Sequence, residues 1–274
     1  MRGIIFDIKE FALNDGDGIR TTVFFKGCPL RCIWCHNPEG LSREPELYIK
    51  RSGCRECGLC KRGCEHEDCK PFGRCLHICP YDLVTAKGKE WDSEELAKKL
   101  LNGAQIYKST GGGITLSGGE PLFQSEFAYE LLSLLRGQVH RSIETSGFAS
   151  EEIFQKVASE CDFIFMDIKL VDDELHRRYT GVSNEKILKN LTWLKSSGIP
   201  HLFRTPLIPK ITDTNENLHA ISNLIGTDRI ELLPYNALAP AKYSGVGRRF
   251  TNLIDSDKSH SPDLSIFKNA TLRK

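Results

Sequence analysis

The feature that most constrains the fold of this 274-residue chain is a regular alternation of strand-like and helix-like segments. From about residue 92 to residue 235, short β-branched and aromatic runs are followed by stretches with apolar residues at helical spacing. Six strands are expected, at 21–27, 113–121, 141–147, 162–170, 201–208 and 229–235. The expected helices between them are 93–109 (with Ser93 as its cap), 126–137, 151–160, 184–198 and 215–226. Repeated βα units predict an α/β protein with a parallel sheet, and six of them need not close an eight-stranded barrel.

Eleven cysteines are the second constraint. The chain lacks the layout of a signal peptide and any apolar run of about 18 residues, so a cytoplasmic protein without a membrane partner is expected. In that compartment cysteines favour metal binding over disulfides. Lys and Arg number 37 against 36 for Asp and Glu, which gives no basic field for nucleic acid. Only Cys161 stands alone in the sequence, and it is expected to be a buried structural thiol.

Uncommon residues gather where the predicted strands end. In parallel βα sheets these ends meet at one edge, and chemistry gathers there. The residues in question are Cys28, Gly118, Gly119, Glu120, Glu144, Thr145, Asp167, Lys169, Arg204, Tyr235 and Asn236. Their shared position predicts one functional site.

The first cysteine group consists of Cys28, Cys32 and Cys35. Three thiolates can hold three corners of a [4Fe–4S] cluster, which leaves the fourth iron open to an amine and a carboxylate. A structural zinc site is the alternative, but zinc requires four closed ligands. His36 is a poor fourth ligand because, directly after Cys35, it points away from it. The triplet therefore favours the open cluster.

The triplet lies within DGDGIRTTVFFKGCPLRCIWCHNPEG, and four further motifs follow it: SGGEP at 117–121, ETSGF at 144–148, DIK at 167–169 and LLPYN…KY at 233–243. This ordered set resembles the radical S-adenosylmethionine (SAM) superfamily, in particular the activating enzymes of glycyl radical enzymes. The resemblance implies a partial (β/α)6 TIM-like barrel. It divides the chain into a barrel at 1–50 and 85–250, an iron–sulfur insert at 51–84 and a C-terminal extension at 251–274, in which no firm structure is expected.

The resemblance also implies an activity. The open cluster binds SAM, and its reductive cleavage gives a 5′-deoxyadenosyl radical that removes a hydrogen atom from a glycine of a cognate glycyl radical enzyme. Flavodoxin or ferredoxin would supply the electron. Two other functions stay open: a radical SAM enzyme that modifies a peptide or small molecule, and a ferredoxin-like electron carrier.

The resemblance assigns SAM contacts to Trp34, His36, Gly118, Gly119, Glu120, Glu144, Thr145, Asp167, Lys169, Arg204 and Asn236. It also implies a monovalent cation beside the SAM carboxylate, held by Asp167, Glu144, Thr145 and the carbonyl of Phe165. Simpler roles compete: a turn for the two glycines, a surface ion pair for Asp167 and Lys169, a surface arginine for Arg204, and packing for Trp34. The family commonly has a histidine where Asn236 stands, and asparagine can donate a hydrogen bond but cannot take up a proton. A second departure is Asp17, where the family often has proline.

The insert begins with a ferredoxin-like run, because Cys54, Cys57, Cys60 and Cys64 are spaced by two, two and three residues. A second run, Cys69, Cys75 and Cys79, has Phe72 where a further cysteine would complete the pattern. Two-cluster ferredoxins exchange their fourth ligands, so Cys79 is expected to join Cys54, Cys57 and Cys60.

The remaining thiols, Cys64, Cys69 and Cys75, leave three outcomes: a [3Fe–4S] cluster, a [4Fe–4S] cluster with a ligand other than cysteine, or an unfilled site. A second cluster with an irregular ligand set is favoured, because unpaired thiols would not stabilise so small a segment. Candidate extra ligands are His66, Asp68 and His77. Zinc is less favoured for the insert because zinc pairs usually have longer spacers. One or two auxiliary iron–sulfur clusters that relay or store electrons are therefore predicted, with two favoured and about 11–12 irons per chain in all.

Overall fold

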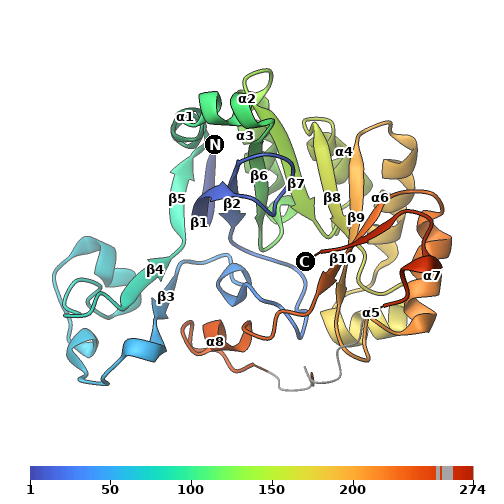
Figure 1. Cartoon of the computed structure of the whole chain (residues 1–274). Coiled ribbons are helices and arrows are strands. Elements are labelled where there is room, and N and C mark those ends of the chain that lie inside the picture. Colours follow the sequence, from blue (N-terminus) through green and yellow to red (C-terminus); the bar gives the residue numbers. More distant parts are fainter. Residues whose placement is uncertain (251–253, 255–261, 274) are drawn as a thin grey trace.

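The computed structural model describes residues 1–250, 254 and 262–273. Its centre is a nine-stranded sheet of order β11-β10-β9-β8-β7-β6-β2-β1-β5 (Figure 1). Seven strands are parallel: β2 (Arg20–Phe25), β6 (Gly113–Gly118), β7 (His140–Thr145), β8 (Phe163–Asp167), β9 (His201–Leu207), β10 (Ile230–Pro234) and β11 (Ala270–Leu272). Two antiparallel strands, β1 (Arg2–Ala12) and β5 (Lys89–Asp92), extend one edge. The α/β class and the six predicted strands are confirmed, and over the described residues the sheet stays open between β5 and β11.

Four predicted helices follow their strands: α3 (Ser125–Leu135), α4 (Glu151–Ala158), α6 (Glu185–Ser196) and α7 (Asn215–Ile225). A short polar helix, α5 (Asp173–Thr180), precedes α6 and was not predicted, since only His176 and Thr180 of it are buried.

The helix predicted at 93–109 is in fact two, α1 (Ser93–Leu101) and α2 (Ala104–Thr110), which separate at Asn102 and Gly103. The expectation that Ser93 caps it was wrong, because the carboxylate of Asp92 accepts the Glu94 N–H at 2.9 Å. The Ser93 hydroxyl instead accepts a hydrogen bond from the Met1 ammonium.

The two faces of the sheet differ in chemistry. Helix residues such as Leu131 of α3 and Leu191 of α6 are fully buried in one core with Ile114 and Leu116 of β6. Burial of each such side chain contributes about 1.5–3 kcal/mol. Side chains that alternate with this core along the strands are polar. Buried examples are Arg20, Thr115, Ser142 and Arg204.

The loop that contains Asp15 and Asp17, between β1 and β2, lies against this polar face. The Thr115 hydroxyl donates to the Asp15 carbonyl at 2.8 Å, and the Thr22 hydroxyl donates to the Asp15 carboxylate at 2.5 Å. The departure at Asp17 is therefore accommodated in a loop that packs against the sheet.

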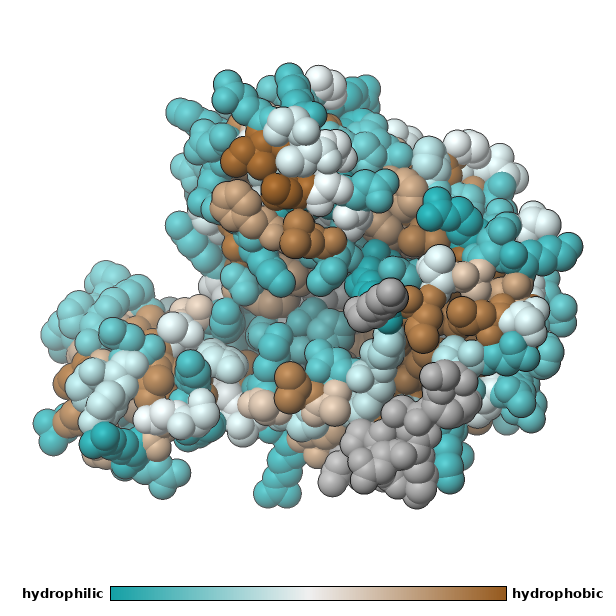
Figure 2. Space-filling view, viewed as in Figure 1, coloured by the Kyte–Doolittle hydropathy of each residue, from teal (hydrophilic) through white to brown (hydrophobic). Residues whose placement is uncertain are grey.

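An antiparallel ribbon, β3 (Glu46–Ile49) and β4 (Val84–Lys87), carries residues 50–83 beside the main body (Figure 1). Figure 2 shows this insert as a separate, largely hydrophilic lobe. Its regular structure is limited to short 3-10 turns at Arg51–Gly53, Leu59–Lys61 and Glu67–Phe72. Between Ile49 and Val84 the buried residues are Cys69 and Cys75, so the insert has no apolar core of its own.

The base of the ribbon is fastened to the sheet. Lys26, just after β2, is fully buried and donates to the Glu46 carboxylate at 2.9 Å. Arg248 donates to the other oxygen of Glu46 at 2.6 Å. The insert is thus held next to the end of β2 and next to helix α8 (Pro240–Tyr243).

The edge strands β11 and β5 were not predicted, and neither was β1 in the N-terminal segment. β11 pairs with β10 through Ile230 and Ala270, and Arg273 donates to Glu231 at 2.8 Å. A strand of three residues, such as β11, is too short to show a hydrophobic period in the sequence. It forms because its backbone pairs with the edge of β10. Among the described residues, no helix has the length and apolar character to cross a membrane.

Candidate active site

The loop after β2 holds Cys28, Cys32 and Cys35 at the carboxyl end of the sheet. Its backbone is pinned to the end of α5, since the Arg31 N–H donates to the Thr180 carbonyl at 2.7 Å. On the other side, the Tyr243 hydroxyl donates to the Cys35 carbonyl at 2.8 Å. These contacts fix the loop between α5 and α8.

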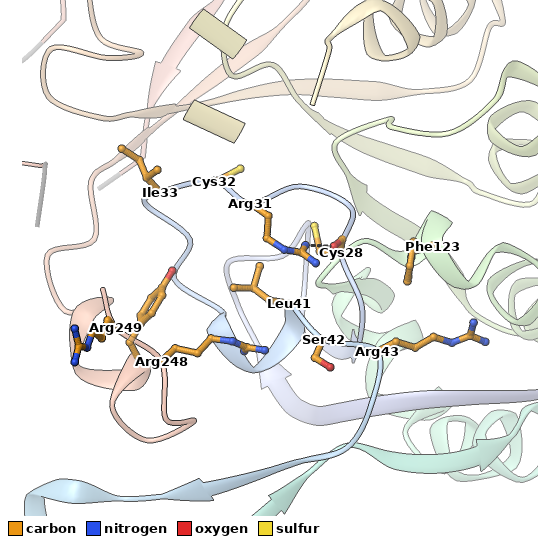
Figure 3. Close-up of a pocket in the computed structure, with 11 residues that line it drawn as sticks. Cys28, Arg31, Cys32, Ile33, Leu41, Ser42, Arg43, Phe123, Arg248 and Arg249 are labelled. Carbon is orange, nitrogen blue, oxygen red and sulfur yellow. Dashed lines mark hydrogen bonds between the residues drawn. The ribbon is translucent and has the colours of Figure 1, made fainter. Parts of the chain in front are cut away.

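The three thiols are half-buried, and burial raises the pKa of each one, that of Cys32 to about 12. Without a metal they would be protonated, because the low-dielectric surroundings disfavour thiolates. A cavity of about 470 Å³ opens beside Cys28 and Cys32 (Figure 3). Three thiols on one loop, two of which line an open cavity, fit a cluster that keeps one iron free.

Asp167 and Lys169, at the end of β8, form a partly buried ion pair near this loop. The Lys169 ammonium donates to the Asp167 carboxylate at 2.8 Å, and its side chain is 10% exposed against 35% for Asp167. Burial alone would lower the Lys169 pKa, but Asp167 and Cys32 outweigh it and raise that pKa above its usual range. Lys169 is therefore a permanent positive charge near the cysteine triplet, unlike an exposed surface pair.

Glu144 and Arg204 meet on the polar face of the sheet. Glu144 accepts from the Ser117 hydroxyl at 2.6 Å and from the Arg204 guanidinium. Arg204 also donates to Glu231 at 2.9 Å and lies 3.7 Å above the ring of Phe165. Burial raises the pKa of Glu144, and the Arg204 charge opposes that shift. Arg204 is 4% exposed, so it is not a surface arginine.

Glu120 links two of the motifs. Its carboxylate is 1% exposed and accepts from the Thr145 hydroxyl at 2.6 Å and from the Ser146 N–H at 2.8 Å. The Ser146 hydroxyl and the Leu122 N–H also donate to it. Glu120 and Thr145 are thus brought together, and their polar atoms hold SGGEP against ETSGF.

Gly118 and Gly119 lie where the chain leaves β6. Gly118 has a φ of +112°, and a Cβ on Gly119 would lie 2.4 Å from the carbonyl oxygens of Gly27 and Gly40. No side chain fits there, because the backbone that follows β6 packs directly on the backbone that follows β2. The two glycines therefore bring SGGEP into contact with the cysteine loop.

Three other predicted residues differ in their burial. Trp34 is buried in a small apolar cluster with Leu170 and Ile208, which agrees with packing. His36 is exposed. Asn236 is also exposed, and its side-chain oxygen accepts the Leu238 N–H at 3.0 Å.

Sequence reasoning missed several residues around the site. Ser117 and Ser146 lie inside quoted motifs, so those motifs were the available signal. The cavity beside the triplet is lined by four arginines, Arg31, Arg43, Arg248 and Arg249. Figure 3 shows the Arg31 side chain lying beside Cys28. No spacing rule marks these arginines, because Arg31 and Arg43 follow β2 whereas Arg248 and Arg249 follow α8, about 200 residues later.

The insert contains a second cavity, of about 250 Å³. Four of the cysteines that the ferredoxin pattern groups together line it: Cys54, Cys57, Cys60 and Cys79. The other three insert cysteines, Cys64, Cys69 and Cys75, gather separately with His66. The seven thiols of the insert thus lie in two spatial groups, one of four and one of three.

Fold and site together define an α/β protein with a mostly parallel sheet and three cysteines in the loop that follows the carboxyl end of β2. Residues 22–220 match the family model of the radical SAM superfamily. The 4-hydroxyphenylacetate decarboxylase activating enzyme of Clostridioides difficile is 35% identical, over 96% of this chain and 92% of that protein. The isethionate sulfite-lyase activating enzyme of Oleidesulfovibrio alaskensis is 37% identical, over 90% and 88%.

A radical SAM methyltransferase from Sphaerobacter thermophilus shares the fold, with a TM-score of 0.55 at 15% identity over 98% of this chain and 76% of that one. The chain belongs to the radical SAM superfamily, and within it to the activating enzymes of glycyl radical enzymes. The resemblance noted from the motifs is confirmed.

Proposed function

We propose that this protein installs a glycyl radical on a cognate partner enzyme, and that Cys28, Cys32 and Cys35 hold the cluster that binds SAM. The observation that carries the proposal is the position of these thiols at the carboxyl end of the sheet, next to Asp167 and Lys169. When bound, the cluster and SAM supply reductive cleavage to a 5′-deoxyadenosyl radical and hydrogen abstraction from glycine.

The residues of the chain position and shield that chemistry. Lys169 stays protonated and offers a fixed charge to a SAM carboxylate. Gly118 and Gly119 bring their backbone close to the triplet loop, and their carbonyl groups are the proposed acceptors for the SAM ammonium group. Arg204 and Glu144 restrain each other, so the floor of the site needs little rearrangement when SAM binds.

The other SAM contacts belong to the same proposal. Glu120 acts by holding Thr145 and Ser146, while Trp34 and His36 act through the backbone that flanks Cys35. Asn236 contacts the nucleoside at the rim.

A monovalent cation beside the SAM carboxylate is also proposed. Asp167, partly exposed at the end of β8, is the main proposed ligand, through the carboxylate oxygen that does not pair with Lys169. The Phe165 carbonyl, on the same strand, is a second proposed ligand. Glu144 and Thr145 would have to share oxygens already used by Arg204 and Glu120.

The open sheet supports a protein substrate. A closed barrel would exclude a folded loop, whereas over the described residues this sheet ends at β11 and β5 without closing. A glycine on a loop of the partner can then reach the carboxyl end of the sheet.

The arginine-lined cavity supports an acidic electron donor, flavodoxin or ferredoxin. Arg31, Arg43, Arg248 and Arg249 surround its mouth next to Cys28. Clustered positive charge attracts an acidic protein and speeds its association. The cytoplasm, where thiols remain reduced, is the compartment that suits both proteins.

One auxiliary cluster is proposed in the insert cavity lined by Cys54, Cys57, Cys60 and Cys79. Four thiols around a cavity of about 250 Å³ match the four corners of a [4Fe–4S] cluster. It would relay or store electrons. The sequence spacing predicts a second cluster at Cys64, Cys69 and Cys75.

The test is a mixture of the reduced protein, SAM and its cognate glycyl radical enzyme. The partner should gain a doublet electron paramagnetic resonance signal. A small molecule or peptide modified in place of the partner would establish the first alternative. Absence of SAM binding by calorimetry would favour the electron carrier.

A further inference from the structure

A compact group of four metal-binding side chains lies in the insert. The ligand atoms of Cys64, His66, Cys69 and Cys75 all lie within 4.8 Å of one another. Three thiols and one imidazole form a donor set of the kind that structural zinc sites use. Two sulfurs bound to the same zinc lie about 3.8 Å apart, since Zn–S bonds are about 2.3 Å long and the geometry is tetrahedral.

The other cysteine groups of this chain provide an internal comparison. Among the described residues, two sets of three or more potential ligands come within 4.8 Å of one another, and both contain Cys69. Neither the triplet Cys28, Cys32 and Cys35 nor the four cysteines around the insert cavity form such a set. Ligands of a cluster bind different irons and stand apart, whereas ligands of one ion converge. The compact spacing therefore points to a single ion.

The surroundings of the sulfurs also suit metal-bound thiolates. Cys69 and Cys75 are 2% and 3% exposed, and they are the buried residues between Ile49 and Val84. The Leu76 N–H donates to the Cys69 sulfur at 3.2 Å. Backbone N–H groups that point at sulfur stabilise thiolates in metal sites. The insert thus buries two sulfurs, one of which accepts a backbone hydrogen bond, and it has no apolar core around them. This combination is typical of a metal centre.

Two histidines are close enough to compete for the fourth position. The rings of His66 and His77 lie edge to face with 4.7 Å between centroids. His77 is engaged through its Nε2 atom with the Asp68 carboxylate at 2.8 Å. Asp68, Cys69 and His77 form the second compact set, but it holds one sulfur only. His66 is therefore the ligand, and His77 packs against its ring.

We propose that Cys64, His66, Cys69 and Cys75 bind one tetrahedral Zn²⁺ ion, which takes the place of an apolar core in the insert. The ion replaces the second cluster that the ferredoxin spacing predicts. Phe72 stands where a cysteine would complete the second run, so that position supplies no ligand. The fourth ligand is His66, which precedes Cys69 in the sequence. This site is independent of SAM cleavage, so it can fail while the proposed function stands.

The experiment is metal analysis of the full-length protein, purified without oxygen from medium that contains both iron and zinc. About eight irons and one zinc per chain are expected: two clusters and one ion. Exchange of the zinc for Co²⁺ should give the visible absorption bands of a tetrahedral cobalt–thiolate site. His66→Ala should lose the zinc and those bands but keep the iron.

His77→Ala is the matched control and should retain both metals. His66→Cys preserves a four-ligand set, so it should retain the ion with a shifted cobalt spectrum. This variant keeps the proposal testable if His66→Ala does not fold. About 11–12 irons without zinc would overturn the proposal and favour a second cluster. A full zinc content in His66→Ala, or zinc loss in His77→Ala alone, would overturn the role of His66.

Discussion

The sheet and the insert are stabilised in opposite ways. In the sheet, helix α3 buries Leu131, Leu132 and Leu135 against β-strands, and the polar face is satisfied by hydrogen bonds. The insert buries only Cys69 and Cys75 between Ile49 and Val84. The hydrophobic effect therefore stabilises the sheet, whereas the insert lacks comparable apolar burial and depends on metal binding under the proposals above.

The largest expected effect concerns the triplet in the sheet region. Cys28→Ala, Cys32→Ala or Cys35→Ala should abolish reductive SAM cleavage, because two thiolates cannot hold the open cluster. Chromatography of 5′-deoxyadenosine from anaerobically reconstituted variants measures this. Cys161→Ala, at a buried thiol far along the chain, should stay active. Normal turnover in any triplet variant would refute the assignment.

Metal removal should separate the two regions. After treatment with a chelator, trypsin is expected to cut within residues 51–74 at least about tenfold faster, since metal binding supplies the folding free energy of such a segment. Mass spectrometry of the fragments locates the cuts. The sheet should resist trypsin in both samples, and equal resistance of the insert before and after treatment would contradict the comparison.

Glu120 tests the polar network of the sheet. Glu120→Gln replaces an oxygen that accepts from Ser146 with an amide donor, and should lower the free energy of unfolding by about 3 kcal/mol. Urea unfolding under anaerobic conditions measures the change. Glu126→Gln breaks an exposed pair with Lys156 and should change stability by less than about 0.5 kcal/mol. Similar values for the two variants would show that burial is not the cause.

The smallest expected effect is at the rim. Asn236→Ala should weaken SAM binding by about 1–2 kcal/mol, the cost of one unmade hydrogen bond. Calorimetry gives the affinity. Because asparagine does not titrate, the wild-type affinity should show no step near pH 6.5, where histidine would titrate. Unchanged affinity in the variant would leave Asn236 with its local contact to Leu238 alone.

Much of the sheet could be predicted from its sequence, since strands such as 113–118 and 201–207 carry strong β-branched and aromatic signals between helical repeats. β11 could not be, because Ala270, Thr271 and Leu272 become a strand only by pairing with β10. The break between α1 and α2 was missed because the apolar spacing continues through Asn102 and Gly103.

For the site, the cysteines were recognised by their spacing, because thiolates that hold one cluster recur at short intervals in a sequence. Asp167 and Lys169 were recognised by their position at a strand end. What the sequence did not reveal is which polar atoms are already engaged. Glu120 reads as a rim carboxylate, yet it is buried among donors from 122, 145 and 146. The arginines of the large cavity come from distant loops, and only the fold brings them together.

The ribbon β3–β4 determines how the insert could be exchanged between this protein and its relatives. Ile49 and Val84 are paired across it, and the Lys50 N–H donates to the Leu83 carbonyl at 2.9 Å. The two points where the insert leaves the ribbon are thus neighbours, and a two-residue turn spans such a gap in ordinary hairpins. Glu46, which Lys26 and Arg248 hold, stays on the sheet side of the cut. The insert is therefore a cassette that can be excised or transplanted at residues 50 and 83 without cutting the attachments of the ribbon.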